Sequence, residues 1–173
     1  MYTPIQRIER MQVSLMNDQR FSALAGIFML GNTEVRDDVP TASTDGVNTV
    51  FGAAFIEALE DAEIRGLIYH GKGGHILYRH LSTWRHLSKI NAELANKAMD
   101  YVINLQIEDF GDPKFIRLPK GGLVDERFRG MDAGQVFRIL EDEDDDGGGY
   151  SFDEHDWEAS EQMPKEEAEA INK

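Results

Sequence analysis

The chain has 173 residues, enough for one hydrophobic core, and no cysteine, which excludes disulfides and thiolate metal sites. Its net charge of −14 is concentrated at one end, because residues 141–173 contain fourteen acidic residues and two lysines. That segment carries −12 and the first 140 residues carry −2. A nearly neutral body argues against nucleic-acid binding, which needs a basic surface, and against a DNA mimic, whose acidity would cover the fold.

The N-terminal residues do not have the pattern of a signal peptide, because Arg7, Glu9 and Arg10 interrupt any apolar run. No segment approaches the ~18 consecutive apolar residues that a membrane-spanning helix needs. We therefore expect a soluble, cytoplasmic protein that has no membrane partner.

The first predicted element is a helix. Thr3 is a good N-cap residue and Pro4 suits the first helical position, so a helix is expected to about residue 19. Residues 27–30 predict a strand followed by a turn, although a helix at residues 18–25 is an alternative. Residues 47–51 predict a second short strand, which would form a β-hairpin with the first.

The middle of the chain is predicted to be helical. Asp61 is the expected N-cap of a helix that carries Glu63 in its first turn. Three glycines in residues 71–74 should interrupt this helix, since each costs ~1 kcal/mol relative to alanine in a helix interior. The remaining helices are expected at residues 75–87, at residues 92–105 and from Asp132 onward, with a loop at residues 106–130.

The C-terminal residues differ in composition from the body. Residues 141–149 are six acids and three glycines, which predicts a disordered linker because little apolar surface is available for burial. Aromatic residues then return around His155, including Trp157, and predict a segment that docks on the body or on a partner. The expected organisation is a domain at residues 1–140, an acidic linker at residues 141–149 and an acidic tail with a docking segment at residues 150–173.

The densest chemical signal is the set of three histidines at positions 70, 75 and 80. Neutral imidazole is the commonest side-chain metal ligand. A zincin helix places two histidines four residues apart, on one face, with a glutamate after the first that acts as the general base. Here His70 and His75 are five residues apart, which separates them by ~140° in an α-helix, and Gly71 stands at the glutamate position.

The third ligand of a zincin often comes from a following helix. Asp100 lies 25 residues after His75 on the next predicted helix, on the same face as Asn96 and Asn104. This spacing makes Asp100 a candidate ligand. The alternative is that its carboxylate only accepts hydrogen bonds between packed helices.

Energetics allow a metal site here without requiring one. A structural zinc ion contributes ~10–16 kcal/mol, whereas three glycines cost a continuous helix ~3 kcal/mol. A π-bulge would accommodate the extra residue and align His70 with His75. Without a metal, the glycine segment is expected to be a break or a loop. We predict one zinc ion held by His70, His75 and either Asp100 or His80; the alternative is that the histidines are ordinary polar positions of an amphipathic helix.

Several segments resemble one known family. They are residues 42–46, 55–80 and 95–104, together with residues 121–125, 130–132 and 153–157. They resemble the putative metallopeptidase domain that occurs upstream of von Willebrand factor A-like modules and as stand-alone proteins of tailed phages, and the last three segments resemble the phage branch. The resemblance covers about residues 40–158. It implies a small zincin-like α+β fold, mostly helical, with a short β-hairpin and here an acidic C-terminal tail.

Members of this family typically show His-Glu-x-x-His, a third histidine five residues later and Ala-x-Asp on the following helix. By this resemblance His75 matches the second histidine, His80 the third and Asp100 the acidic residue. His70 falls one place too early for the first. Residues 71–74 replace Glu-x-x with one extra residue and no glutamate, a departure that affects catalysis more than fold.

The resemblance implies a phage-type zinc metallopeptidase whose catalysis is degenerate, acting in the host cytoplasm. Glu63, seven residues before His70, is a candidate substitute base: it shares that face of the helix but lies two turns away. The alternative is a non-catalytic interaction protein that uses the scaffold and acidic tail to bind a protein or peptide partner with basic character. A third possibility is self-inhibition, in which His155 or Asp156 folds back onto the cleft.

Overall fold

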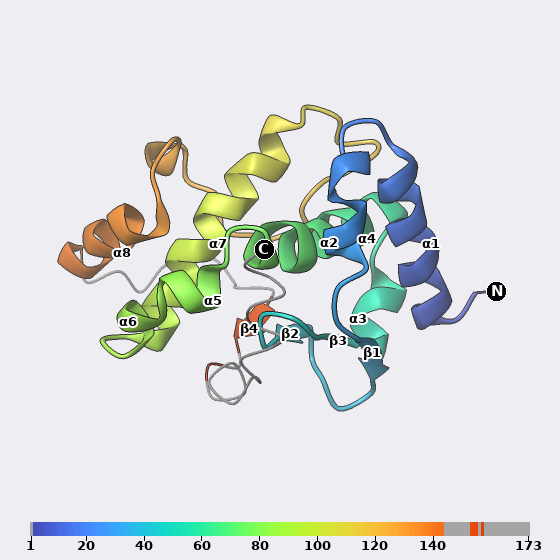
Figure 1. Cartoon of the computed structure of the whole chain (residues 1–173), viewed down its shortest axis with the longest axis horizontal. Coiled ribbons are helices and arrows are strands. Elements are labelled where there is room, and N and C mark those ends of the chain that lie inside the picture. Colours follow the sequence, from blue (N-terminus) through green and yellow to red (C-terminus); the bar gives the residue numbers. More distant parts are fainter. Residues whose placement is uncertain (1, 144–152, 156, 158–173) are drawn as a thin grey trace.

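The structure, a computed structural model, describes residues 2–143, 153–155 and Trp157. These residues form a mostly helical α+β domain, as predicted. Helices α1 (Pro4–Asn17) and α8 (Ala133–Asp142) lie at opposite ends of the molecule, and the long helix α7 (Ala92–Asp109) runs between them (Figure 1). Among the described residues, no helix combines the length and apolar character that crossing a bilayer requires.

Two predicted helix starts are confirmed by reciprocal caps. The Thr3 hydroxyl accepts a hydrogen bond from the Gln6 backbone N–H, and the Gln6 side chain accepts one from the Thr3 N–H. Asp132 and Gln135 make the same pair of bonds at the start of α8. Each cap satisfies backbone donors that a helix N-terminus otherwise leaves without intrahelical partners.

The strand expected at residues 27–30 is wrong. A 3₁₀ turn, η1 (Ser22–Leu24), leads into the short helix α2 (Ala25–Phe28), and the Phe28 side chain is fully buried in the core. A short apolar run suits a buried helical turn as well as a buried strand, so its composition does not distinguish them. The expected turn is present: Gly31 has φ +64°, and an added Cβ would lie only 2.0 Å from the Val47 carbonyl oxygen.

A small sheet lies beneath the helices in Figure 1. Its strands are β1 (Thr33–Arg36), β2 (Ala42–Thr44), β3 (Thr49–Gly52) and β4 (Asp153–His155), in the order β1-β3-β2-β4. Strands β2 and β3 are antiparallel and form the hairpin, while β1 pairs with β3 and β4 pairs with β2 in parallel. The predicted hairpin therefore exists, but its first strand is β2 and not residues 27–30.

The hairpin turn depends on Asp45 and Gly46. One Asp45 carboxylate oxygen accepts hydrogen bonds from the backbone N–H groups of Val47 and Asn48, at 2.9 and 2.7 Å. Gly46 has φ +95°, a backbone conformation that side chains with a Cβ rarely adopt. The turn fixes the register in which Ala42 lies opposite Phe51.

Helices α3 (Ala53–Ala58) and α4 (Asp61–Ile68) follow the hairpin. The N-cap of α4 is Glu60 and not the predicted Asp61, which is the first helical residue. A Glu63 carboxylate oxygen accepts a hydrogen bond of 2.8 Å from the Glu60 backbone N–H. The first turn of α4 is therefore acidic, as predicted, but the helix begins one residue earlier than expected.

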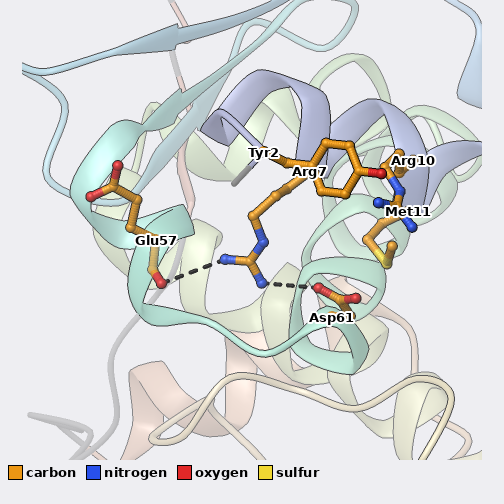
Figure 2. Close-up of a pocket in the computed structure, with 6 residues that line it drawn as sticks. All are labelled: Tyr2, Arg7, Arg10, Met11, Glu57 and Asp61. Atoms are coloured by element: carbon orange, nitrogen blue, oxygen red, sulfur yellow. Dashed lines mark hydrogen bonds and ion pairs between the residues drawn. The ribbon is translucent and has the colours of Figure 1, made fainter.

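A pocket of about 520 Å³ lies between α1, α3 and α4 (Figure 2). Arg7 reaches across it and donates hydrogen bonds to the Ile56 and Leu59 carbonyl oxygens, both at 2.7 Å. Its guanidinium also pairs with Asp61 at 3.0 Å. Arg7 thereby joins the first helix to the connection between α3 and α4.

Two apolar clusters flank the centre of the molecule. One joins α1, α2, α4 and the sheet; the other joins α7 and α8 and includes Trp157 at its margin. The π-helix η2 (Tyr69–Ile76) contributes Tyr69 to the first cluster, and the short helices α6 (Arg85–Ser88) and η3 (Glu126–Phe128) contribute Leu87 and Phe128 to the second. The short helix α5 (His80–Thr83) follows η2. The expected linker lies mostly outside the described residues, as do Tyr150, Phe152 and Asp156 of the expected docking segment.

Candidate metal centre

The glycine-containing segment is a continuous π-helix, so the predicted break at residues 71–74 is wrong. The glycines allow close packing: a Cβ on Gly74 would lie 2.6 Å from the Ile103 side chain on α7, and one on Gly73 would lie 2.8 Å from the Tyr69 ring. The packing therefore requires residues without a Cβ at these two positions, despite the ~1 kcal/mol intrinsic cost of each glycine. The π-bulge that the sequence allowed thus extends through the whole segment.

This helix type brings His70 and His75 together. In a π-helix each N–H bonds to the carbonyl five residues earlier, so residues five apart lie one above the other, as residues four apart do in an α-helix. The ~140° separation expected for an α-helix therefore does not apply. The two imidazole rings lie on one face, with centroids 4.8 Å apart.

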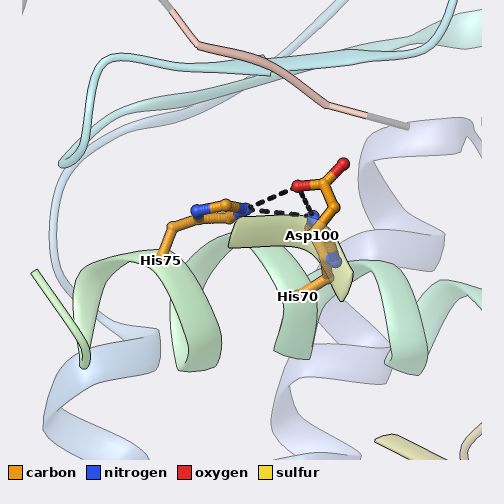
Figure 3. A group of neighbouring side chains, drawn as sticks. All are labelled: His70, His75 and Asp100. Atoms are coloured by element: carbon orange, nitrogen blue, oxygen red, sulfur yellow. Dashed lines mark hydrogen bonds and ion pairs between the residues drawn. The ribbon is translucent and has the colours of Figure 1, made fainter. Parts of the chain in front are cut away.

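Asp100 completes the cluster from α7 (Figure 3). The Nε2 atoms of His70 and His75 are 3.0 Å apart, and each lies 3.3 Å from Oδ1 of Asp100. A tetrahedral zinc ion with bonds of about 2.0–2.1 Å holds its ligand atoms about 3.3–3.4 Å apart. The triangle of donor atoms is therefore close in size to one face of a zinc coordination tetrahedron.

Asn104 orients His70. The Asn104 amide group donates to the Leu123 carbonyl oxygen at 2.9 Å, which directs its own oxygen toward His70 Nδ1, also at 2.9 Å. Because an amide oxygen only accepts, Nδ1 carries the proton and the Nε2 lone pair faces the cluster. The sequence signal for Asn104 was its position four residues after Asp100, but only the structure shows that it contacts a histidine.

His80 contacts the opposite side of His75. Its Nδ1 lies 3.3 Å from Nδ1 of His75, whose Nε2 points toward Asp100. The group of donor atoms that converge on one point consists of His70, His75 and Asp100 and does not include His80. The structure therefore places His80, a predicted ligand, against the ring of His75, another predicted ligand.

Burial favours the neutral form of His75 and His80. All three side chains of the cluster are at most 2% exposed. Burial lowers the pKa of His75 well below its ordinary value, and the neighbouring His70 and His80 lower it further. Burial also lowers the pKa of His80, to about 4. A neutral imidazole has the free lone pair that a metal ligand needs.

The predicted substitute base lies elsewhere. The Glu63 carboxylate caps the first turn of α4 and lies 3.8 Å from the Arg117 guanidinium. Lys72 is buried and donates to the carbonyl oxygens of Phe28 and Leu30, so it too is directed away from the histidines. Within the donor cluster of the described residues, Asp100 supplies the only carboxylate.

A second pocket, of about 530 Å³, lies between α5, α7, η3 and α8. Its described lining residues include His80, Trp84, Gln106 and Phe128, but not His70, His75 or Asp100. The pocket therefore reaches the periphery of the cluster at His80.

The comparison with family models agrees with this arrangement. The model described as putative metallopeptidase domain matches residues 9–172, nearly the whole chain. The chain belongs to that family. No curated protein and no solved structure matches it. The buried cluster of two histidines and an aspartate is a group that could bind a metal, in a chain of a metallopeptidase-like family.

Proposed function

We propose that this metallopeptidase-like protein binds one zinc ion through His70, His75 and Asp100, and that its peptidase activity is absent or very weak. The observation that carries the proposal is the triangle of donor atoms, with sides of 3.0, 3.3 and 3.3 Å. Two neutral imidazoles and a carboxylate are a donor set typical of catalytic zinc, with a fourth position for water. When bound, zinc would polarise a carbonyl group and lower the pKa of a coordinated water to about 7.

The surrounding residues support the ligands. Asn104 holds the His70 ring with Nε2 toward the cluster, and His80 contacts the far nitrogen of His75. Such outer contacts fix ring orientation and commonly change metal affinity 10–100-fold when they are removed. Both histidines thus have the support expected of ligands.

The weak point is proton transfer. Gly71 occupies the position where the family pattern has glutamate, and Glu63 is engaged at the start of α4. General acid–base catalysis typically contributes ~10²–10⁴-fold, so loss of the base leaves little turnover.

Metal content tests the first part. Protein purified without chelator is expected to contain about one equivalent of zinc by elemental analysis, which also reports iron, another metal that two histidines and a carboxylate can bind. His75→Ala and Asp100→Ala should lose the metal. His86→Ala, which alters an exposed histidine, is the matched control and should retain it. Less than a tenth of an equivalent in the wild-type protein, even after reconstitution, would exclude the centre.

Peptide cleavage tests the second part. The wild-type protein should cleave casein or a peptide library weakly or not at all. Deleting Gly73 and replacing Gly71 with Glu creates His-Glu-Lys-Gly-His and should raise the rate, whereas the deletion alone should not. Robust, chelator-sensitive cleavage by the wild-type protein would overturn the proposed weak activity.

The missing glutamate also favours a second function, that of an interaction protein. Residues 141–173, with a net charge of −12, would attract a basic protein or peptide partner, such as a host or phage component in the host cytoplasm. Exposed charges are screened by salt, so binding should weaken sharply between low and high ionic strength. A full-length variant with Asp144, Asp145 and Asp146 replaced by Asn should bind such a partner more weakly; equal binding would count against the tail.

A further inference from the structure

The edge of the sheet is completed by the C-terminal part of the chain. Strand β4 pairs with β2 in parallel, so that Ala42, Ser43 and Thr44 lie opposite Asp153, Glu154 and His155. Strand β3 occupies the other side of β2. Without β4, the outer edge of β2 would present unpaired backbone groups, which are a template for any extended peptide.

The segment is anchored two residues later. The Trp157 indole N–H donates a hydrogen bond of 3.1 Å to the Asn96 side-chain oxygen, and the ring packs against the apolar cluster of α7 and α8. Asn96 lies four residues before Asp100 and therefore on the same face of α7. The segment thus extends from the sheet to the helix face that carries the aspartate of the cluster.

The hairpin lies on the same side of the histidines as β4. A Cβ added to Gly46 would lie 3.4 Å from Leu81, the residue after His80, so the hairpin turn rests on α5. Figure 3 shows the ribbons of the hairpin and of β4 on the side of the cluster where the His75 and Asp100 side chains are displayed. The sheet and its added strand therefore lie over the side of the cluster from which His75 and Asp100 project, and the cluster itself is almost completely buried.

We propose that the edge of β2 and Asn96 together form a docking site for an extended peptide that ends in an aromatic anchor, and that the chain's own Asp153–His155 strand and Trp157 occupy it. Strand addition uses backbone hydrogen bonds for affinity and a few side-chain contacts for specificity. Here the specific contact is the indole on Asn96. A three-residue strand at a sheet edge opens readily, so a competing peptide can displace it.

The regulatory consequence rests on the proposed metal centre, whereas the docking site itself does not. With the segment in place the donor cluster is closed to a peptide substrate. Displacement of the segment exposes the same edge to a peptide from another protein. The substrate class indicated is an unfolded or extended chain with a tryptophan two residues after the paired stretch.

The test measures the binding of a fluorescent synthetic peptide of residues 150–160 to the full-length protein. Binding is monitored by the fluorescence anisotropy of the peptide, in the presence of a chelator. Trp157→Ala releases the internal segment but leaves the site intact, so it should bind the peptide at least about tenfold more tightly than the wild-type protein. Asn96→Ala also releases the segment but removes the acceptor, so it should bind weakly. A peptide carrying alanine for tryptophan should fail with every variant.

Amide hydrogen exchange gives an independent reading. Residues 42–44 should exchange faster in Trp157→Ala than in the wild-type protein, and the added peptide should restore protection. Trp157→Phe keeps the aromatic ring and should lie between the two. Equal peptide binding by the wild type, Trp157→Ala and Asn96→Ala, or unchanged exchange in residues 42–44, would overturn the proposal.

The two proposals fail separately. Loss of metal binding with intact peptide docking refutes the zinc centre alone. Failure of docking with one equivalent of zinc refutes the occupied edge alone. If both hold, a chelator should remove zinc faster from Trp157→Ala than from the wild-type protein, because the cluster is then open.

Discussion

The π-helix η2 and the α-helix α7 contribute to the same cluster through different backbone geometries. In η2 the paired side chains are five residues apart, and glycines occupy three of the four positions between them. In α7 the side chains of Asn96, Asp100 and Asn104 are four residues apart, and the helix contains no glycine. The comparison shows that a ligand spacing has meaning only together with the helix type, which packing against neighbours can change.

The largest effect is expected where the two helices touch. In Gly74→Val the new side chain meets Ile103 across the interface, because even its Cβ would lie 2.6 Å from that side chain. Overpacking typically costs ~1–3 kcal/mol, so the free energy of unfolding should fall by about that amount, and metal affinity should fall with it. Gly26→Ala in α2 is the control, since its added Cβ meets nothing within 4 Å. Urea denaturation measures the free energy of unfolding of both variants. Equal stability of Gly74→Val and the wild type would show that η2 and α7 are not in close contact.

The second effect concerns the hydrogen bonds from Lys72 of η2 to the chain at α2. Lys72→Ala leaves the carbonyl oxygens of Phe28 and Leu30 without their ammonium donor, at a cost of about 1–3 kcal/mol. Lys72→Met retains the packing of the side-chain stem and should be destabilised less. Thermal unfolding of the two variants checks the order, and a Lys72→Ala variant as stable as the wild type would contradict a stabilising role of these hydrogen bonds.

The third effect is on metal affinity, through α7. Asn104→Leu removes the acceptor that fixes the His70 tautomer and should weaken zinc binding by about 10–100-fold. Asn104→Asp keeps an oxygen acceptor at the same position and should bind more tightly than Asn104→Leu. Competition with a chromogenic chelator measures these affinities. If Asn104→Leu binds zinc as well as the wild type does, His70 is not oriented from α7.

Removing the contact that His80 makes to His75 of η2 should reduce zinc affinity less than Asn104→Leu does. His80→Phe removes the contact to the far nitrogen of His75, which at 3.3 Å is longer than the contact between His70 and Asn104. The same chelator titration should show a loss of affinity below that of Asn104→Leu. A loss as large as that of His75→Ala would instead identify His80 as a ligand.

The smallest effect concerns the connection between η2 and α5. Arg79 has φ +54°, in the left-handed region that residues with a Cβ seldom adopt. Arg79→Gly relieves this strain but adds conformational entropy to the unfolded state, and the two effects largely offset each other. The free energy of unfolding should therefore rise by less than about 1 kcal/mol, seen as a slightly higher melting temperature. Arg79→Ala, which keeps a Cβ, is the control and should give no gain.

The sequence predicted several features that depend on neighbours along the chain, although it placed the cap of α4 one residue late, at Asp61. The caps at Thr3 and Asp132 require only a side chain and the backbone three residues later, and both are present. The break at residues 71–74 was wrong because the contacts that hold η2 together come from Phe28 and Ile103, which are distant in sequence.

The same distinction applies to the cluster. His70, His75 and Asp100 were expected as neighbours from spacing and family resemblance, and the structure brings them together. The position of His80 behind His75 depends on the left-handed residue Arg79, which turns the chain between η2 and α5. No local pattern in the sequence encodes that turn, because arginine has no preference for it.

The parallel pairing of β2 and β4 also sets an order of events during synthesis. Thr44 pairs with His155, 111 residues further along the chain. His70, His75 and Asp100 leave the ribosome before any residue of β4, so the edge of β2 stays open while they assemble. Contacts between residues so far apart in sequence form slowly. A nascent chain therefore passes through a stage in which the cluster has its side chains but lacks the strand that covers it, and an ion can enter then.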